Sequence, residues 1–323
     1  MADLRAIKLA NGVEMPSLGF GCAFGYWSNG AKTEGDHQVE MFRPDEAWRP
    51  LQLALKTGWR HFDAALVYGT HRHLGVTLGM KFADGSLERK DVFITTKVFH
   101  PPAPFTLNTQ GKTINFQQDT DIKAKIKGDI ERSLDELGVG YVDLLLMHWP
   151  GEFATTDEAV GRQRRKECWE VFEEALAMGR ARAIGVSNFT QKHLDTFLQD
   201  VKVPPMCNQI EVSPYFTRDD LRAYCKEKGI VVVAWGPFGS GATGVLTDEV
   251  IKAKAEKYKK NVGQVILRWM LQLGIAALPK SSSESRMLSN LDVFDFEISE
   301  EDMKEMGSLN KDISSAATPD SIA

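Results

Sequence analysis

The chain has 323 residues, a length that suits one large α/β barrel with insertions and also allows two ordinary domains. Hydrophobic residues make up 43% of it and charged residues 26%, which is the composition of an ordinary globular protein. The net charge of −5 provides no general positive field, so nucleic acid and anionic membranes are not expected as partners.

The cysteines and the N-terminus bear on compartment. Cys22, Cys168, Cys207 and Cys225 have neither CxxC nor metal-site spacing, which favours reduced thiols and no metal. The first six residues lack the apolar segment of a signal peptide, and no apolar run approaches the ~20 residues that span a bilayer. We expect a cytoplasmic, soluble protein that is a monomer, with a dimer left open.

The N-terminal region predicts a hairpin followed by a strand. Asn11-Gly12 lies between apolar residues within 5–15, a strong hairpin signal, and residues 18–21 form a first short strand. Residues 19–25 nearly match the dinucleotide fingerprint GxGxxG, but that motif requires a helix at its third glycine, and a loop follows here. We therefore interpret these glycines as a tight strand exit and not as a Rossmann phosphate site.

Strands and helices are predicted to alternate along the rest of the chain. The strand runs are apolar throughout, as strands buried on both faces require. Gly138, Gly179, Gly229 and Gly274 are predicted to end four of the helices. The predicted strands are 18–21, 61–63, 92–97, 142–149, 183–188, 206–211, 230–236 and 275–281. The predicted helices are 44–57, 71–83, 121–137, 162–178, 190–200, 218–228, 248–259 and 262–273, with two more that begin near 283 and 299.

This alternation predicts a single (β/α)₈ TIM barrel domain over residues 1–323, with the N-terminal hairpin closing the bottom. Residues 99–120 are rich in proline and polar residues without a period, so we expect a long loop over the active-site face. Residues 311–323 are expected to form a C-terminal tail, which is small, polar and mobile from Ser314 onward.

Polar side chains end several of the predicted strands. Asp63, Lys97 and His148 close three of them, and Tyr68 follows five residues after Asp63. A barrel of this kind keeps its active site at the C-terminal ends of its strands, so the four side chains would converge there. Singly, each has an ordinary structural explanation as a surface lysine, a core histidine or a helix cap. All four in this pattern indicate a catalytic site.

The four residue types suit proton transfer to a carbonyl oxygen. A lysine ammonium beside a tyrosine favours the phenolate and is expected to lower the tyrosine pKa, while Asp63 keeps Lys97 charged and oriented. Tyr68 would then donate a proton at neutral pH, and His148 would donate a hydrogen bond to the substrate oxygen.

These residues lie in motifs through which the chain resembles the aldo-keto reductase family. The resemblance extends from about residue 5 to about 310 and implies a barrel that binds NADPH without a Rossmann fold and reduces aldehydes or ketones. The motifs are residues 58–65, Tyr68, 96–97, 144–150, 184–189, 208–211 and 278–281.

The resemblance also implies a set of cofactor-binding residues. The nicotinamide carboxamide would contact Ser187, Asn188 and Gln209, and Trp235 would stack on the ring. The pyrophosphate would lie along the segment that contains Gly236, Phe238, Ser240 and Gly241. Two cations and three hydroxyls within seven residues suit the adenosine 2′-phosphate, which favours NADPH over NADH. That phosphate cluster is Lys280, Ser281, Ser282, Ser283 and Arg286, with Asn290 near the adenine.

The chain departs from the family pattern in places that affect the substrate. Cys22-Ala23 replaces the usual Thr-Trp after the first strand and removes a common aromatic wall. Phe24, Tyr26, Trp27 and Trp149 are the candidates for another wall. Gly236 stands where the family usually has serine, and Ser289 where it usually has glutamate at the adenine.

We therefore expect an NADP-dependent oxidoreductase that reduces a small-molecule carbonyl. A non-catalytic NADPH-binding or redox-sensing subunit is the alternative from another class, although the intact tetrad argues against it. Reduction of a C=C bond would call for glutamate at the position of His148. A hydrolase or aldolase on the same barrel remains open, because fold alone does not give function. A Schiff-base lysine would have to be neutral, and Asp63 beside Lys97 opposes that.

Overall fold

Eight parallel strands form a barrel in the computed structural model of the chain, which describes residues 4–25, 42–99, 105–109, 112–116, 121–151, 157–316 and 318–322. Neighbouring strands pair in the order β12-β11-β10-β9-β8-β5-β4-β3, and a parallel bridge between Leu18 and Ala277 joins the two ends of the sheet. The barrel strands are β3 (Phe20–Gly21), β4 (His61–Asp63), β5 (Phe93–Val98), β8 (Val142–Met147), β9 (Ala181–Ser187), β10 (Cys207–Glu211), β11 (Val231–Trp235) and β12 (Ala276–Leu278).

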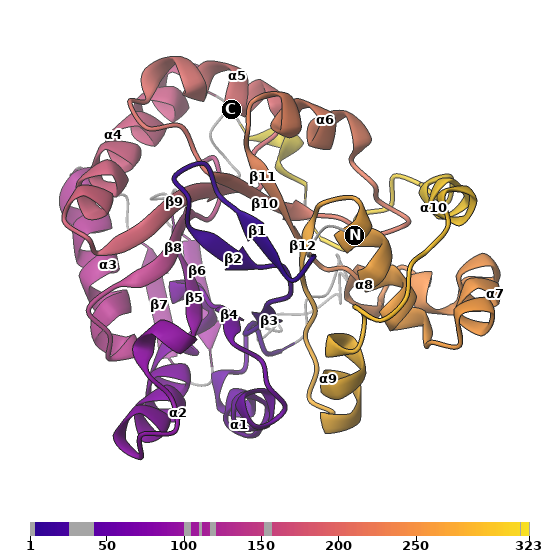
Figure 1. Cartoon of the computed structure of the whole chain (residues 1–323). Helices are drawn as coiled ribbons and strands as arrows, with labels where there is room; N and C mark the ends of the chain where they lie inside the picture. The colour runs from indigo at the N-terminus through magenta and orange to yellow at the C-terminus, as the bar shows by residue number, and fades with distance from the viewer. Residues whose placement is uncertain are drawn as a thin grey trace, which may run out of the picture.

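Helices surround the strands, as Figure 1 shows. The strand interiors are buried almost without interruption, as the continuous apolar runs predicted. The helices are α1 (Trp48–Lys56), α2 (His71–Ala83), α3 (Ile122–Leu137), α4 (Glu158–Ala177), α5 (Gln191–Asp200), α6 (Asp219–Glu227), α7 (Glu249–Tyr258), α8 (Val262–Gln272), α9 (Glu284–Leu291) and α10 (Glu300–Gly307).

The predicted N-terminal hairpin is present. Strands β1 (Ala6–Lys8) and β2 (Glu14–Pro16) pair antiparallel, and Met15 on β2 is fully buried. The hairpin is joined to the start of the barrel because the main chain of Ala277 donates a hydrogen bond of 2.8 Å to Ser17. It crosses one end of the barrel in Figure 1, opposite the end at which the strands finish.

Gly19 marks the point at which the barrel closes. A Cβ atom there would lie 2.5 Å from a methyl carbon of Leu278 and 2.8 Å from Nδ1 of His61, so a larger side chain would force the two strands apart. Residues 22–24 after β3 have no helical conformation. Gly19 is therefore a close-packing residue of the barrel seam, whereas the residues after Gly25, where GxGxxG would require a helix, lie outside the described residues.

The segment after β5 differs from the predicted irregular loop. Strands β6 (Phe105–Thr109) and β7 (Lys112–Phe116) pair antiparallel as a separate two-stranded sheet. The predicted 99–120 loop thus contains an antiparallel pair of strands among its described residues. Among the described residues, no helix has the length and apolar character needed to cross a membrane.

Candidate active site

Lys97 is the junction of the predicted catalytic group. It lies near the end of β5 with its side chain fully buried, and its ammonium nitrogen donates to three oxygens. Nζ lies 2.6 Å from Oδ1 of Asp63, 3.0 Å from the main-chain oxygen of Ala64 and 3.3 Å from the hydroxyl of Tyr68. Every N–H of the ammonium therefore has an acceptor, which is the condition for holding a charged lysine inside a barrel.

The electrostatics of this group differ from the sequence expectation for Tyr68. The pKa of Tyr68 is raised from 10.0, because burial of the phenol outweighs the opposing effect of the Lys97 charge. The expected lowering was wrong, since it considered the ammonium but not the desolvation of a phenolate. Burial also acts to lower the pKa of Lys97, but the Asp63 carboxylate and Tyr68 more than compensate, and the net pKa is raised. Tyr68 and Lys97 are both protonated at neutral pH.

His148 lies beside Tyr68 and directly follows β8, the strand that pairs with β5. The two rings meet edge to face with centroids 5.6 Å apart, and His148 is 8% exposed. Burial, and secondarily the charge of Lys97, holds the pKa of His148 well below its usual value. The imidazole is therefore neutral at pH 7, and a neutral ring carries one N–H that can donate to a substrate oxygen.

Aromatic side chains surround the Tyr68–His148 pair, although they are only partly those predicted. Trp149 stacks beside His148 with ring centroids 6.4 Å apart, while Phe24 packs instead against Phe20. Two aromatic residues that the sequence interpretation missed are close to the pair: the ring centroid of Phe42 lies 5.1 Å from that of Tyr68, and the ring centroid of Phe99 lies 5.1 Å from that of His148. The predicted wall residues Tyr26 and Trp27 lie outside the described residues.

The residues predicted to hold a carboxamide are joined to one another and to the tetrad. Asn188 has a left-handed conformation (φ 62°) at the end of β9 and donates a bond of 3.0 Å to the main-chain oxygen of His148. Its side-chain oxygen accepts from the indole N–H of Trp235 at 3.0 Å. The Ser187 hydroxyl donates to the main-chain oxygen of Gln209, whose side-chain nitrogen donates to Oδ2 of Asp63 at 2.7 Å.

The segment after β11 turns sharply through residues with positive φ. Gly236 has φ 63°, Gly239 has φ 58°, and Ser240 adopts φ 51° within the short 3₁₀ turn Gly239–Gly241. Ser240 and Gly241 are exposed, and Phe238 and Gly236 are partly buried. The main-chain N–H groups of Gly239, Gly241 and Ala242 donate to carbonyl oxygens within this turn, so its own hydrogen bonds hold it in this conformation.

The predicted phosphate cluster lies where β12 leads into α9. Lys280, Ser282 and Arg286 are at least partly exposed, whereas Ser281 is buried and bonds with the main chain of Ser283. The Ser283 hydroxyl caps α9 by accepting from the main-chain N–H of Arg286. The helix N-terminus adds a partial positive charge to the two cations. Asn290, predicted near the adenine, is buried on the same helix.

Comparisons with known proteins show the family to which the chain belongs. The sequence model of the Aldo/keto reductase family matches residues 23–311. The chain belongs to that family. It is 37% identical over 316 residues to glyoxal reductase of Bacillus subtilis (strain 168), covering 98% of this chain and 96% of that protein.

Solved aldo-keto reductases have the same fold. An enzyme from a Medee basin deep-sea metagenome superimposes with a TM-score of 0.79 at 29% identity, covering 98% of this chain and 99% of that one. A silkworm (Bombyx mori) enzyme, solved in a complex with NADPH, superimposes with a TM-score of 0.78 at 31% identity, covering 97% and 89%. The (β/α)₈ fold inferred from the sequence is therefore confirmed.

The C-terminal tail of this aldo-keto reductase is docked on the barrel. Glu211, at the end of β10, accepts from the Ser314 hydroxyl at 2.5 Å and from the Ser315 main-chain N–H at 2.7 Å. Ser315 and Ile322 are almost completely buried, and the Ile322 main-chain oxygen lies 2.9 Å from Nε2 of His193. The described part of the tail, which the sequence was expected to leave mobile from Ser314 onward, is thus packed against the barrel. Its anchor is a carboxylate that the sequence interpretation included only as part of a motif.

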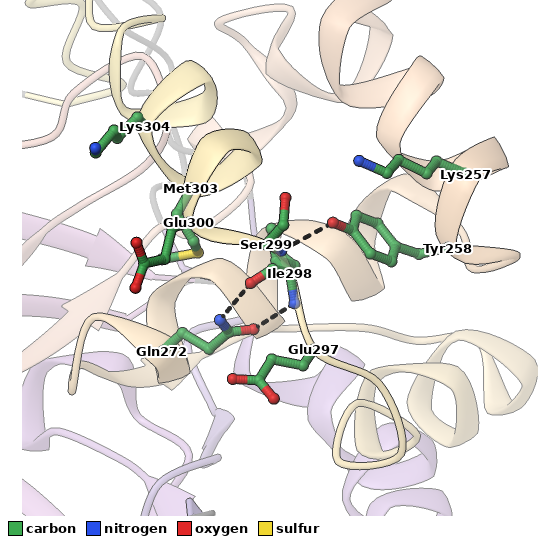
Figure 2. A pocket seen from close by; sticks show the side chains of 9 residues that line it. All are labelled: Lys257, Tyr258, Gln272, Glu297, Ile298, Ser299, Glu300, Met303 and Lys304. Carbon is green, nitrogen blue, oxygen red and sulfur yellow. Dashed lines mark hydrogen bonds between the residues drawn. The ribbon is translucent and has the colours of Figure 1, made fainter.

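A hollow of about 620 Å³ lies apart from the tetrad, among α7, α8 and the chain that leads into α10. Figure 2 shows how its wall is fixed: Gln272 exchanges two hydrogen bonds with the main chain of Ile298, and the Tyr258 hydroxyl accepts from the N–H of Ser299. Two lysines and two glutamates line it, so it has no net preference for one charge. None of the predicted site residues lines it. Its lining residues are Lys257, Tyr258, Gln272, Glu297, Ile298, Ser299, Glu300, Met303 and Lys304.

Proposed function

We propose that the protein is an NADPH-dependent oxidoreductase that reduces an aldehyde or ketone to an alcohol, with Tyr68 as the proton donor. The single observation that supports this most directly is the Lys97 ammonium, which bonds to Asp63 and Tyr68 together beside a neutral His148. A buried, protonated phenol next to a neutral imidazole donor suits protonation of a carbonyl oxygen better than it suits a nucleophilic or metal-dependent reaction.

The residues around the tetrad fit the proposed cofactor. Asn188 and Gln209 provide amide groups for a carboxamide, and Trp235 is partly exposed next to them for a planar ring. Lys280 and Arg286 are exposed at the N-terminus of α9, where a phosphate group would be stabilised by both charges. When bound, NADPH supplies the hydride that adds to the carbonyl carbon.

Each residue of the tetrad then has a distinct task. Tyr68 transfers its hydroxyl proton to the carbonyl oxygen as the hydride arrives at the carbon, which yields the alcohol and leaves a phenolate. Lys97 stabilises that phenolate by charge, and Asp63 holds the ammonium in place. His148 orients the carbonyl oxygen by donating a hydrogen bond. Phe42, Phe99 and Trp149 form apolar surroundings of low dielectric constant, in which the electrostatic interactions of these groups are stronger than in water.

The test combines turnover and cofactor binding. Tyr68→Phe is expected to abolish NADPH oxidation with glyoxal, methylglyoxal or an aromatic aldehyde, while NADPH still quenches tryptophan fluorescence as it does in the wild type. Turnover that survives in Tyr68→Phe would reject Tyr68 as the proton donor. Binding of NADPH without turnover of any carbonyl by the wild type would favour the regulatory or redox-sensing alternative.

A further inference from the structure

Gln209 connects two opposite walls of the barrel. It lies on β10, and Asp63 lies on β4, four strands away in either direction around the closed sheet. Its side chain nevertheless reaches Asp63, with Nε2 only 2.7 Å from Oδ2. Both residues are buried, at 2% and 4% exposure. The bond is therefore shielded from water, and nothing in the chain sequence places its partners near each other.

This bond completes the hydrogen bonding of the Asp63 carboxylate. Oδ1 accepts from Lys97 at 2.6 Å, and Oδ2 accepts from Gln209. A carboxylate can only accept at neutral pH, so the amide must present its nitrogen to Asp63 and direct its oxygen elsewhere. A hydrogen bond to an ionised group is roughly twice as strong as a neutral one, so Gln209 fixes the rotation of the carboxylate about its side chain.

The main chain of Gln209 is held by the other two predicted carboxamide residues. Its oxygen accepts from the Ser187 hydroxyl at 2.8 Å and from the Asn188 main-chain N–H at 2.9 Å. The side chain therefore starts from a fixed position at the rim of β9 and β10. The end of the Gln209 side chain reaches the tetrad, where its amide nitrogen donates a hydrogen bond to Asp63.

We propose that Gln209 is a positioning residue for proton transfer, which ties the carboxamide of the cofactor to the Asp63–Lys97–Tyr68 group through the two ends of one amide. The inference deepens the proposed function and rests on it. The amide oxygen would accept from the carboxamide of bound NADPH, while the amide nitrogen donates to Asp63. Without the nitrogen, the carboxylate is free to rotate and Lys97 loses its fixed alignment with the Tyr68 hydroxyl. Loss of Gln209 should therefore lower kcat for the chemical step as well as the affinity for the cofactor.

Two substitutions separate the two ends of the amide. Gln209→Glu retains an oxygen acceptor for the carboxamide at every pH, but it can donate to Asp63 only when its carboxyl group is protonated. Gln209→Met has a similar length and can neither donate nor accept. An unperturbed glutamate has a pKa of about 4.3, and the neighbouring Asp63 carboxylate and burial raise it toward neutrality. Donation to Asp63 by the introduced carboxyl group is therefore present at low pH and lost as the pH rises.

The measurement is kcat with saturating NADPH and aldehyde from pH 5.5 to 8.5, together with NADPH affinity by fluorescence. Gln209→Glu is expected to have kcat within about threefold of the wild type at pH 5.5 and at least about 10-fold below it at pH 8.5, with NADPH affinity nearly unchanged. Gln209→Met is expected to be low at every pH and to bind NADPH weakly. If thermal unfolding shows that Gln209→Met does not fold, the kcat–pH profile of Gln209→Glu alone tests the inference.

The other titratable groups near Asp63 are common to all three proteins. They are unchanged in sequence, so a pH dependence confined to Gln209→Glu originates in the carboxyl group introduced at residue 209. A Gln209→Glu profile parallel to that of an active wild type would overturn this inference and leave the proposed function intact. A wild type that reduces no carbonyl would overturn both. The shared groups are Cys22 from the end of β3, His61 on β4, Tyr68, Lys97 on β5, His148 after β8 and Cys207 on β10.

Discussion

Lys97 and Asp63 form an ion pair of 2.6 Å in which the two side chains are 0% and 6% exposed. Removing two charges from water costs several kcal/mol per ion, and the pair tolerates this only because the lysine also bonds to Ala64 and Tyr68 and the carboxylate to Gln209. Each partner is therefore required to keep the other in the barrel. The pair supports the proposed chemistry, and breaking it should also lower the free energy of unfolding.

Loss of one partner of this pair is expected to destabilise the protein more than loss of both. Lys97→Met leaves a buried carboxylate without its cation and should lower the free energy of unfolding by about 3–5 kcal/mol, with loss of activity. The double variant Lys97→Met with Asp63→Asn should recover a large part of that stability and none of the activity. Urea denaturation and turnover measure the two effects. Equal stability of the single and double variants would contradict the coupling.

The pH dependence of reduction should be set by Tyr68 rather than by His148. A proton donor is active below its pKa, and burial raises the pKa of Tyr68 above 10.0, so kcat should hold through the neutral range and decline only above pH 10. Burial keeps His148 neutral from well below pH 6.5 upward, so it should add no inflection near neutrality. A kcat profile from pH 6 to 10.5 tests this. An inflection near pH 6.5 that disappears in His148→Gln would contradict it.

The two exposed cations at the start of α9 should determine which nicotinamide nucleotide binds. Lys280→Ala and Arg286→Ala are each expected to weaken NADPH binding by about 10-fold or more and to leave NADH binding nearly unchanged, because only NADPH has the extra phosphate. Trp235 next to Asn188 provides the fluorescence signal.

Lys56→Ala is a matched control for that experiment. Lys56 is an exposed lysine that pairs with Glu284, in the first turn of the same helix, at 2.8 Å. Its removal alters the charge near α9 without touching the predicted cluster, so both affinities should stay at wild-type values. A fall in NADPH affinity as large as that of Lys280→Ala would point to general electrostatics instead of a specific phosphate site.

The barrel strands, and the polar residues at their C-terminal ends, were predictable from the sequence because both depend on the order of apolar and polar residues within a short segment. Apolar runs that close on a polar residue mark a buried parallel strand and its functional end, and Asp63, Lys97 and His148 follow that rule. The β6–β7 hairpin also left a local signal, since Gln110-Gly111 separates two five-residue runs that alternate in polarity. The surrounding prolines obscured it.

Three features were not accessible from local pattern. The bond between Gln209 and Asp63 joins residues 146 positions apart on opposite strands, so no spacing rule reveals it. The rise in the pKa of Tyr68 depends on how deeply the phenol is buried, which a list of neighbouring charges does not contain. The tail was predicted to be mobile from its own small residues, whereas its anchor at Glu211 lies more than one hundred positions earlier.

Glu211 is expected to control the attachment of that tail. Its two oxygens hold Ser314 and Ser315, and the Ser315 hydroxyl lies 3.0 Å from that of Ser240 in the turn proposed to follow the pyrophosphate. Glu211→Ala removes both acceptors and leaves the Ser315 N–H unpaired, which should cost about 1–3 kcal/mol of local stability. Limited proteolysis should then cleave the tail faster than in the wild type, while the barrel core stays intact.

Glu211→Gln tests the charge of the Glu211 side chain, because glutamine has nearly the same shape but does not ionise. Burial raises the pKa of Glu211, so the folded state binds its proton more tightly than the unfolded state does. The stability that this group contributes is thus present at low pH and lost as the pH rises through the raised pKa. Glu211→Gln should remove that pH dependence. The difference in unfolding free energy between the wild type and Glu211→Gln should therefore change between pH 4 and pH 8. A constant difference across this range, with the tail of Glu211→Ala as resistant to protease as that of the wild type, would contradict an anchoring role for Glu211.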